Sequence, residues 1–187
     1  MSVYEDNSVI NLFYLDKLRN LDAKNQAQIG SARRFLLPSP SSSSATLAAA
    51  GDATVKFTIP QTQGIELPVV APSVHNKPYR YTYGITKIDP KVNHTIADGI
   101  IKLDMSSPST TKIWSKPNHT PSEPVFVPRP DGKEEDDGVL LSIVLDEKAT
   151  RSSLVVIDAK EMKEVARAEM GTVFPIGFHG VWCEGDM

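Results

Sequence analysis

The sequence has 187 residues, enough for one domain with a hydrophobic core and too few for most two-domain arrangements. Hydrophobic residues make up 40% of the chain and charged residues 23%, which is typical of a globular protein and excludes a disordered or fibrous one. The formal net charge of −3 excludes a basic surface for nucleic acid, but it leaves shallow membrane contact through an apolar patch open.

The sequence shows no recognisable targeting signal. The single cysteine, Cys183, has no internal disulfide partner and favours a reducing compartment. The first twenty residues carry acids early and contain no continuous apolar region of the kind found in signal peptides. No stretch approaches the 18 or so apolar residues of a membrane-spanning helix. We therefore expect a cytoplasmic protein, with membrane association left open.

The first fifty residues contain one clear strand. Residues 9–21 mix β-branched, aromatic and leucine side chains, and their periodicity does not separate a strand from a short helical turn. Residues 31–37 end at a proline and are typical of a strand. Residues 39–50 contain four consecutive serines, a proline and several alanines, a composition that predicts a surface loop.

The rest of the chain predicts an all-β fold. Short alternating or apolar runs, separated by turn residues, predict strands at 54–59, 64–70, 79–85, 99–104, 111–115, 123–128, 139–146, 152–159 and 163–170. This spacing is typical of a sandwich, a barrel or a propeller. The last three strands predict an up-and-down meander with a polar edge strand, and a similar cadence recurs at 99–114. Radial repetition favours a propeller, while a sandwich stays open.

Four histidines are candidate metal ligands. Three of them, His75, His94 and His119, lie in polar or proline-rich segments, so we expect solvated loop positions. None pairs with another histidine at a metal-ligand spacing. His179 differs because it follows the apolar run 173–178, and we expect its ring to be buried. A core histidine bonded to a carbonyl group and a metal ligand are both open for it.

Two glutamates also have apolar neighbours. Glu66 lies in the run GIELPVV and Glu123 in PSEPVFVP. A carboxylate inside an apolar strand needs a donor or a cation, because an isolated buried charge is costly. The N–H of a metal-bound imidazole is one such donor, and a structural salt bridge or a partly exposed edge position is the alternative.

Two further patterns have structural interpretations. The acidic run 134–137 precedes a glycine and predicts a solvated hairpin turn, since its spacing does not match a calcium loop of the EF-hand type. Tyr79, Tyr81 and Tyr83 alternate and therefore share one strand face, which is more typical of packing than of a substrate wall.

Several longer motifs together resemble one known family. They are PSEPVFVPRPDGKEEDDGVLLSIVLD (121–146), SSLVVIDAKEMKEVARAEM (152–170) and FPIGFHGVW (174–182), preceded by ELPVV (66–70) and KPYRYTYGI (77–85). In order and spacing they resemble the last segment of the carotenoid cleavage oxygenases. The resemblance covers nearly the whole chain, with the serine-rich segment 39–50 as its main departure.

The resemblance implies a fold and a site. Members of this family are seven-bladed β-propellers that bind iron(II) on the propeller axis through four histidines, and glutamates hold three of those rings. The chain would then form about three C-terminal blades over residues 1–187. His179 matches the last iron ligand, and Glu66 and Glu123 match two of the glutamates. Phe178 would line the apolar substrate tunnel.

The resemblance also implies an activity. The family cleaves a conjugated double bond of a carotenoid or apocarotenoid with dioxygen, and it uses iron(II) as cofactor. The other three iron ligands lie upstream in the family, and His75, His94 and His119 do not match their contexts. We therefore expect an iron(II) dioxygenase fragment that is inactive alone and has no specific protein partner. The alternative is a non-catalytic, propeller-like interaction module built on the same scaffold.

Overall fold

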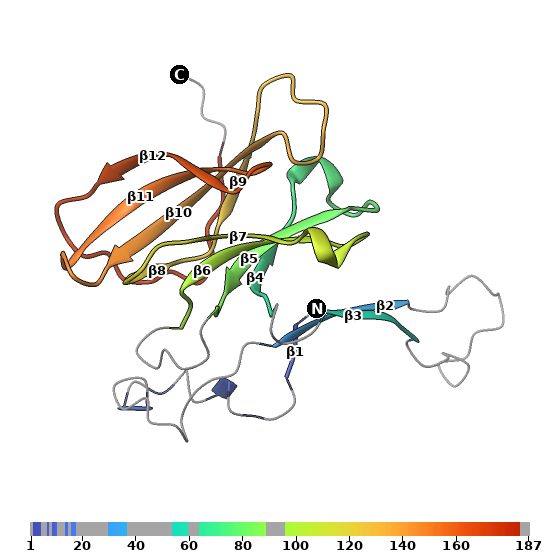
Figure 1. The fold of residues 1–187 in the computed structure, drawn as a ribbon, viewed down its shortest axis with the longest axis horizontal. Coiled ribbons are helices and arrows are strands. Elements are labelled where there is room, and N and C mark those ends of the chain that lie inside the picture. The colour runs from blue at the N-terminus through green and yellow to red at the C-terminus, as the bar shows by residue number, and fades with distance from the viewer. Residues whose placement is uncertain are drawn as a thin grey trace.

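The computed structural model describes residues 2–4, 7, 9–10, 14, 16–17, 30–36, 54–59, 64–88 and 96–183. Nearly all of the regular structure in these ranges is β-strand, arranged as three antiparallel sheets (Figure 1). The all-β prediction is therefore confirmed. Within the described ranges, no helix is both long and apolar enough to span a membrane. The serine-rich segment 39–50, His94 and most of 9–21 lie outside the described residues.

The first sheet is small and joins the N-terminal residues to the body of the protein. It contains β1 (Ser2–Val3), β2 (Ser31–Leu36) and β3 (Thr54–Ile59), in that spatial order. One end of it is buried, because Ala32 and Ile59 pack with Ile65 and with two residues of the next sheet, Ile101 and Leu103. The apolar residues at this end of β2 and β3 thus fix the small sheet against its neighbour.

The second sheet is a four-stranded meander. Its strands are β4 (Glu66–Val69), β5 (Tyr81–Thr86), β6 (Gly99–Asp104) and β7 (Lys112–Ser115), and each pairs with the next in sequence. Short 3-10 helices at Pro72–Val74 and Pro108–Thr110 occupy two of the connections. Every residue of β6 is buried, which explains why its sequence is mostly apolar.

The third sheet contains the predicted C-terminal meander. Strands β10 (Gly138–Asp146), β11 (Arg151–Asp158) and β12 (Lys163–Glu169) pair consecutively, as the sequence predicted. On its other side, β10 pairs with two short strands in succession, β8 (His119–Pro121) and β9 (Val125–Pro128). The sequence analysis missed β8, because three residues between proline-rich turns give no periodicity.

The main core lies between the second and third sheets. Buried side chains from both sheets form one cluster, which includes Tyr83, Ile100, Trp114, Phe126, Leu140, Val144, Val155 and Ile157. The rings of Tyr83 and Phe126 lie 5.6 Å apart between centroids. Burial of these residues on alternate strand positions accounts for the period-two patterns in the sequence. The two adjacent meanders contain the two copies of the strand pattern that recurs in the sequence, at 99–114 and in the last three strands.

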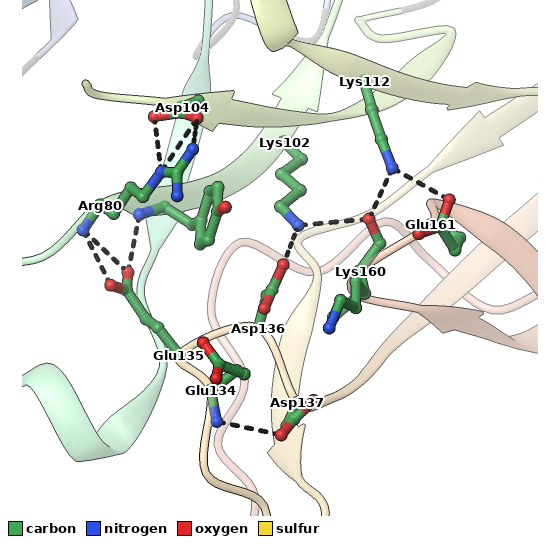
Figure 2. Close-up of polar contacts among 12 residues, drawn as sticks. Arg80, Lys102, Asp104, Lys112, Glu134, Glu135, Asp136, Asp137, Lys160 and Glu161 are labelled. Carbon is green, nitrogen blue, oxygen red and sulfur yellow. Dashed lines mark hydrogen bonds and ion pairs between the residues drawn. The ribbon is translucent and has the colours of Figure 1, made fainter. Parts of the chain in front are cut away.

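The acidic run lies in the turn of the β9–β10 hairpin, as predicted, but the prediction that it is solvated holds for Glu134 and is wrong for Asp136. Asp136 is buried, and its carboxylate lies 2.6 Å from the ammonium group of Lys102, which is also buried (Figure 2). The same ammonium group lies 4.1 Å from the centre of the Tyr81 ring. The turn is therefore held against β6 by a cation that lies more than thirty residues away in sequence.

Glu135 makes a second attachment from the same turn. Its carboxylate accepts hydrogen bonds from the backbone amides of Arg80, at 2.9 and 3.0 Å, and Tyr81, at 2.6 Å (Figure 2). The Arg80 guanidinium in turn binds the buried carboxylate of Asp104 at 2.7 Å. Acids at the turn thus bind the start of β5, which couples the third sheet to the second.

Candidate metal centre

Glu123 lies at the break between β8 and β9. Both short strands pair with β10, and the residues between them face Ser142 and Ile143. Ser142 donates its hydroxyl to the Ser122 carbonyl at 2.9 Å, and the Ser122 amide donates to the Ile143 carbonyl at 2.9 Å. Prolines lack the amide that a strand ladder needs, so those flanking Ser122 and Glu123 interrupt the strand. The interruption fixes Glu123 in a buried position with its carboxylate available.

The segment after β12 returns to this break without regular secondary structure. Ser152, at the start of β11, fixes its first part: the Ser152 amide donates to the Thr172 carbonyl at 2.8 Å, and the Phe174 amide donates to the Ser152 hydroxyl at 3.0 Å. At its far end, a side chain on Gly180 would begin 3.2 Å from a methyl group of Val125 on β9. Glycine thus permits close approach of the backbone to the third sheet.

His179 and Gly180 both bind the carboxylate of Glu123. Nδ1 of His179 lies 3.1 Å from Oε1, and the Gly180 amide donates to Oε2 at 2.7 Å. A carboxylate only accepts hydrogen bonds, so Nδ1 carries the proton and the lone pair of a neutral ring lies on Nε2. The sequence analysis named Glu123 and His179 as candidates for one site without pairing them, and the structure brings the two side chains into contact. The Gly180 amide was not foreseen.

The expected burial of His179 is wrong. Its side chain is 78% exposed, while that of Glu123 is 8% exposed. The apolar neighbours that suggested burial are themselves exposed: Val173, Phe174, Ile176, Val181 and Trp182. An apolar run predicts burial only when another part of the structure covers it, and no described residue covers this segment.

Glu66 and Phe178 lie in different surroundings. Glu66 is half-buried at the start of β4, and its Oε1 accepts a hydrogen bond from the Gly30 amide at 2.9 Å. Its predicted role beside a ligand histidine stays a prediction, because the hydrogen bond described for its carboxylate comes from a backbone amide. Phe178 is 55% exposed and precedes His179 on the same uncovered segment.

The remaining histidines behave differently from one another. His75 is exposed after the first 3-10 helix, as predicted. His119 was expected in a solvated loop, and that prediction is wrong because the residue begins β8 and is 7% exposed. Its Nδ1 lies 3.0 Å from the Pro117 carbonyl oxygen, and its Nε2 lies 3.8 Å from the Asp146 carboxylate. Pairing of His119 with Asp146 in the β8–β10 ladder draws the ring inside.

His179 fits one position of a metal site. Its Nε2 lone pair is exposed and its Nδ1–H is held by a carboxylate, which is the arrangement that orients metal-binding histidines. The described part of the chain contains no cluster of three or more His, Cys, Asp or Glu residues that could hold a metal ion. One imidazole alone binds a divalent metal weakly, so the described residues supply one corner of a site rather than a complete one.

Comparison with known proteins establishes the family. A family model described as retinal pigment epithelial membrane protein matches residues 1–184. The chain belongs to this carotenoid oxygenase family. Torulene dioxygenase of Fusarium fujikuroi is 34% identical over 97% of this chain and 33% of its own length. A carotenoid dioxygenase of Neurospora crassa is 42% identical over 66% of this chain and 20% of its own length. The chain thus spans about a third or less of these relatives.

Solved structures of the carotenoid oxygenase family agree with the fold. A variant of the Synechocystis apocarotenoid oxygenase superposes with a TM-score of 0.70 at 29% identity, covering 88% of this chain and 33% of that one. A cobalt-substituted form of the Synechocystis protein superposes with a TM-score of 0.64 at 32% identity, covering 74% of this chain and 28% of that one. The arrangement of described strands is therefore that of a carotenoid oxygenase.

Proposed function

We propose that this chain is the C-terminal part of a carotenoid or apocarotenoid cleavage dioxygenase that uses iron(II) and dioxygen. The contact of His179 with the buried carboxylate of Glu123 carries the proposal, because it orients an exposed Nε2 as metal ligands are oriented. The dioxygenases among its relatives support the reaction class. In this proposal, the two packed meanders and the N-terminal sheet form about three blades of a seven-bladed propeller.

Each described residue of the site has a separate task. His179 offers Nε2 to the metal, and Glu123 accepts its Nδ1–H and so fixes the tautomer and the direction of the ring. The Gly180 amide holds the second oxygen of Glu123 and prevents rotation of the carboxylate. Phe178 and its exposed apolar neighbours provide a surface suited to a polyene. Iron(II), when bound, supplies the activation of dioxygen.

The proposal requires ligands beyond the described residues. His75 and His119 take no part in the site, since one is exposed on another connection and the other is bonded within the third sheet. The relatives are about three times as long as this chain, which leaves ample length for further ligands. We therefore expect residues 1–187 alone to show no turnover with added iron(II).

The test compares residues 1–187 with the complete natural polypeptide that contains them. Each is supplied with iron(II), dioxygen and β-carotene or an apocarotenal, and aldehyde products are separated by chromatography. Products are expected only from the complete polypeptide, and His179→Ala should abolish them while His75→Ala leaves them unchanged. Clear product from residues 1–187 alone would contradict the requirement for further ligands, and unchanged turnover in His179→Ala would refute the metal role.

A second function is favoured by the isolation of His179 among the described residues. A propeller-like interaction module could keep the scaffold and lack the chemistry. The natural coding sequence upstream of Met1 distinguishes the two. An in-frame extension with three histidines in the family's contexts supports the enzyme, whereas a natural start at Met1 supports the interaction module.

A further inference from the structure

The break between β8 and β9 contains one extra residue. The ladder pairs that flank the break are Pro121 with Val144 and Val125 with Leu141. Three residues, 122–124, therefore lie opposite two, 142 and 143. An extra residue on one strand of an antiparallel pair is a β-bulge, and bulges beside active sites change the direction of a side chain. The residue at the centre of this bulge is Glu123, whose carboxylate binds the His179 ring.

The hydroxyl of Ser142 holds the peptide unit that leads into Glu123. It donates to the Ser122 carbonyl oxygen at 2.9 Å, and that carbonyl lies in the same planar unit as the Glu123 amide. The Ile143 carbonyl oxygen lies 3.4 Å from the hydroxyl, but it already accepts the Ser122 amide at 2.9 Å. A hydroxyl has one proton to donate, so the shorter contact is the effective hydrogen bond. The orientation of this peptide plane therefore depends on Ser142.

The proline after Glu123 restricts the same backbone from the other side. The ring of Pro124 fixes its own φ and confines the residue before it to extended conformations. Glu123 is thus restrained by covalent geometry on its C-terminal side and by a hydrogen bond on its N-terminal side. Of these two restraints, only the hydrogen bond depends on a side chain from another strand.

Ser142 is a buried polar residue in an apolar strand. Its neighbours along β10 are leucine, isoleucine and valine residues. A buried hydroxyl is unfavourable unless it has a partner, and the bulge supplies that partner in the Ser122 carbonyl. Ser122 is buried as well, so water has little access to its carbonyl if the hydroxyl is removed. The bulge is therefore expected to shift when Ser142 loses its hydroxyl.

The direction of the Glu123 side chain matters because two donors bind it at once. Nδ1 of His179 lies 3.1 Å from one carboxylate oxygen, and the Gly180 amide donates to the other at 2.7 Å. Two donors on two oxygens restrict the direction of a carboxylate more than one donor does. A rotation of the bulge would lengthen at least one of these contacts and release the imidazole ring.

We propose that Ser142 is a positioning residue of the metal centre. Its hydroxyl sets the direction of Glu123 through the Ser122 carbonyl, and Glu123 sets the direction of the His179 ring. The inference rests on the proposed function, because it treats Nε2 of His179 as a metal ligand. It assigns a role in the site to a residue that touches neither the metal nor the histidine.

The experiment uses the complete natural polypeptide loaded with Co²⁺, a metal that has been substituted into a Synechocystis relative. The rate of Co²⁺ transfer to excess chelator and the visible absorption of the bound metal are measured for Ser142→Ala, Glu123→Ala and the double variant. We expect on the order of tenfold faster release for Glu123→Ala, since loss of a carboxylate behind a ligand typically costs that much or more. Ser142→Ala should release Co²⁺ about threefold faster, because the carboxylate remains but is less well directed.

Non-additivity distinguishes positioning from a merely structural role. The double variant should release Co²⁺ at the rate of Glu123→Ala alone, because the Ser142 hydroxyl then has no carboxylate to direct. A general loosening of the third sheet would instead add to the effect of Glu123→Ala. Ser153→Ala, which removes the hydroxyl of a buried serine on the neighbouring strand β11, is the control and should match the unsubstituted protein.

Two further variants at position 142 separate the hydroxyl from side-chain volume. Threonine and valine have nearly the same shape, and only threonine carries a hydroxyl. Ser142→Thr should therefore retain Co²⁺ nearly as well as the unsubstituted protein, while Ser142→Val should release it about threefold faster. Equal release from the two variants would show that volume rather than the hydrogen bond controls the site.

Three results would each overturn the inference: equal release from the threonine and valine variants, release from Ser142→Ala at the rate of Ser153→Ala, and additive effects in the double variant. Each of them leaves the proposed function standing if the unsubstituted protein retains Co²⁺ and His179→Ala loses it. Failure of the unsubstituted protein to bind Co²⁺ would overturn the proposed function, and with it the positioning role of Ser142.

Discussion

Removal of the Asp136 carboxylate is expected to destabilise the protein more than any other change in the acidic turn. Asp136→Ala leaves the Lys102 ammonium group, whose side chain is 5% exposed, without its partner at 2.6 Å. Breaking a buried ion pair from one side costs about 3–5 kcal/mol. The Lys160 carbonyl at 3.3 Å and the Tyr81 ring remain near the cation and offset part of that cost. We therefore expect a loss of about 3 kcal/mol.

The measurement is urea unfolding followed by tryptophan fluorescence. Trp114 is 6% exposed in the main core and reports on its exposure to water. A loss of about 3 kcal/mol is a large part of a typical unfolding free energy of about 5–15 kcal/mol, so the midpoint should shift clearly at an unchanged slope. Lys102→Met combined with Asp136→Ala should recover much of the loss, because no unpaired charge then remains buried.

A neighbouring acid provides the control. Glu134 is exposed in the same run, and Glu134→Ala should change the unfolding free energy by no more than about 0.5 kcal/mol. If Asp136→Ala costs less than about 1 kcal/mol, or costs the same as Glu134→Ala, the turn is solvated after all. The polar attachment between the second and third sheets would then depend on Glu135 rather than on the pair of Lys102 and Asp136.

Three other expectations follow from the same contacts. Gly84→Ala places a methyl group 2.5 Å from the Glu66 carbonyl oxygen on β4 and should lower the unfolding free energy by about 1–3 kcal/mol. An unchanged melting temperature would contradict the close approach of the two strands at this position. Asp104→Asn should cost about 2 kcal/mol at pH 7. Arg80 and nearby donors hold the pKa of Asp104 well below its ordinary value, so the carboxylate stabilises the fold fully above about pH 4 and progressively less as the pH falls. Urea titrations at pH 7 and pH 3 should therefore show a smaller difference in unfolding free energy between the variant and the unsubstituted protein at pH 3. Glu123→Gln should release His179 from its single tautomer, which nitrogen chemical shifts of the ring report, and a ring that keeps its Nδ1 proton would refute the contact.

Most strands were predictable because their side-chain alternation reflects real burial. Residues 139–146 are almost all apolar, and β10 alternates between buried and half-buried side chains over most of that span. The strands at 54–59 and 99–104 have the predicted bounds, since turn residues or prolines flank them in the sequence. Strand β8 was missed because its three residues contain no full period, and its existence depends on pairing with β10.

The failures concern residues whose environment is set by distant parts of the chain. The acidic run looked solvated because Lys102, on β6, cannot be identified from local sequence as the partner of Asp136. His119 looked exposed for a similar reason, since its burial depends on the β8–β10 ladder. Local composition describes hydration well, but it does not describe long-range pairing.

In the candidate site, too, one residue is placed by nearby strands and the other lies in surroundings that local sequence did not predict. Glu123, the hydrogen-bond acceptor, is 8% exposed and fixed by strands of the third sheet, while the side chain of His179, which it contacts, is 78% exposed. Orientation of the ring is therefore determined within this chain, by Glu123 and the position of Gly180. A metal bound there would still be open to water on the side of the exposed apolar segment. In the proposed enzyme, low-dielectric surroundings and further ligands would therefore both have to come from residues other than the described ones.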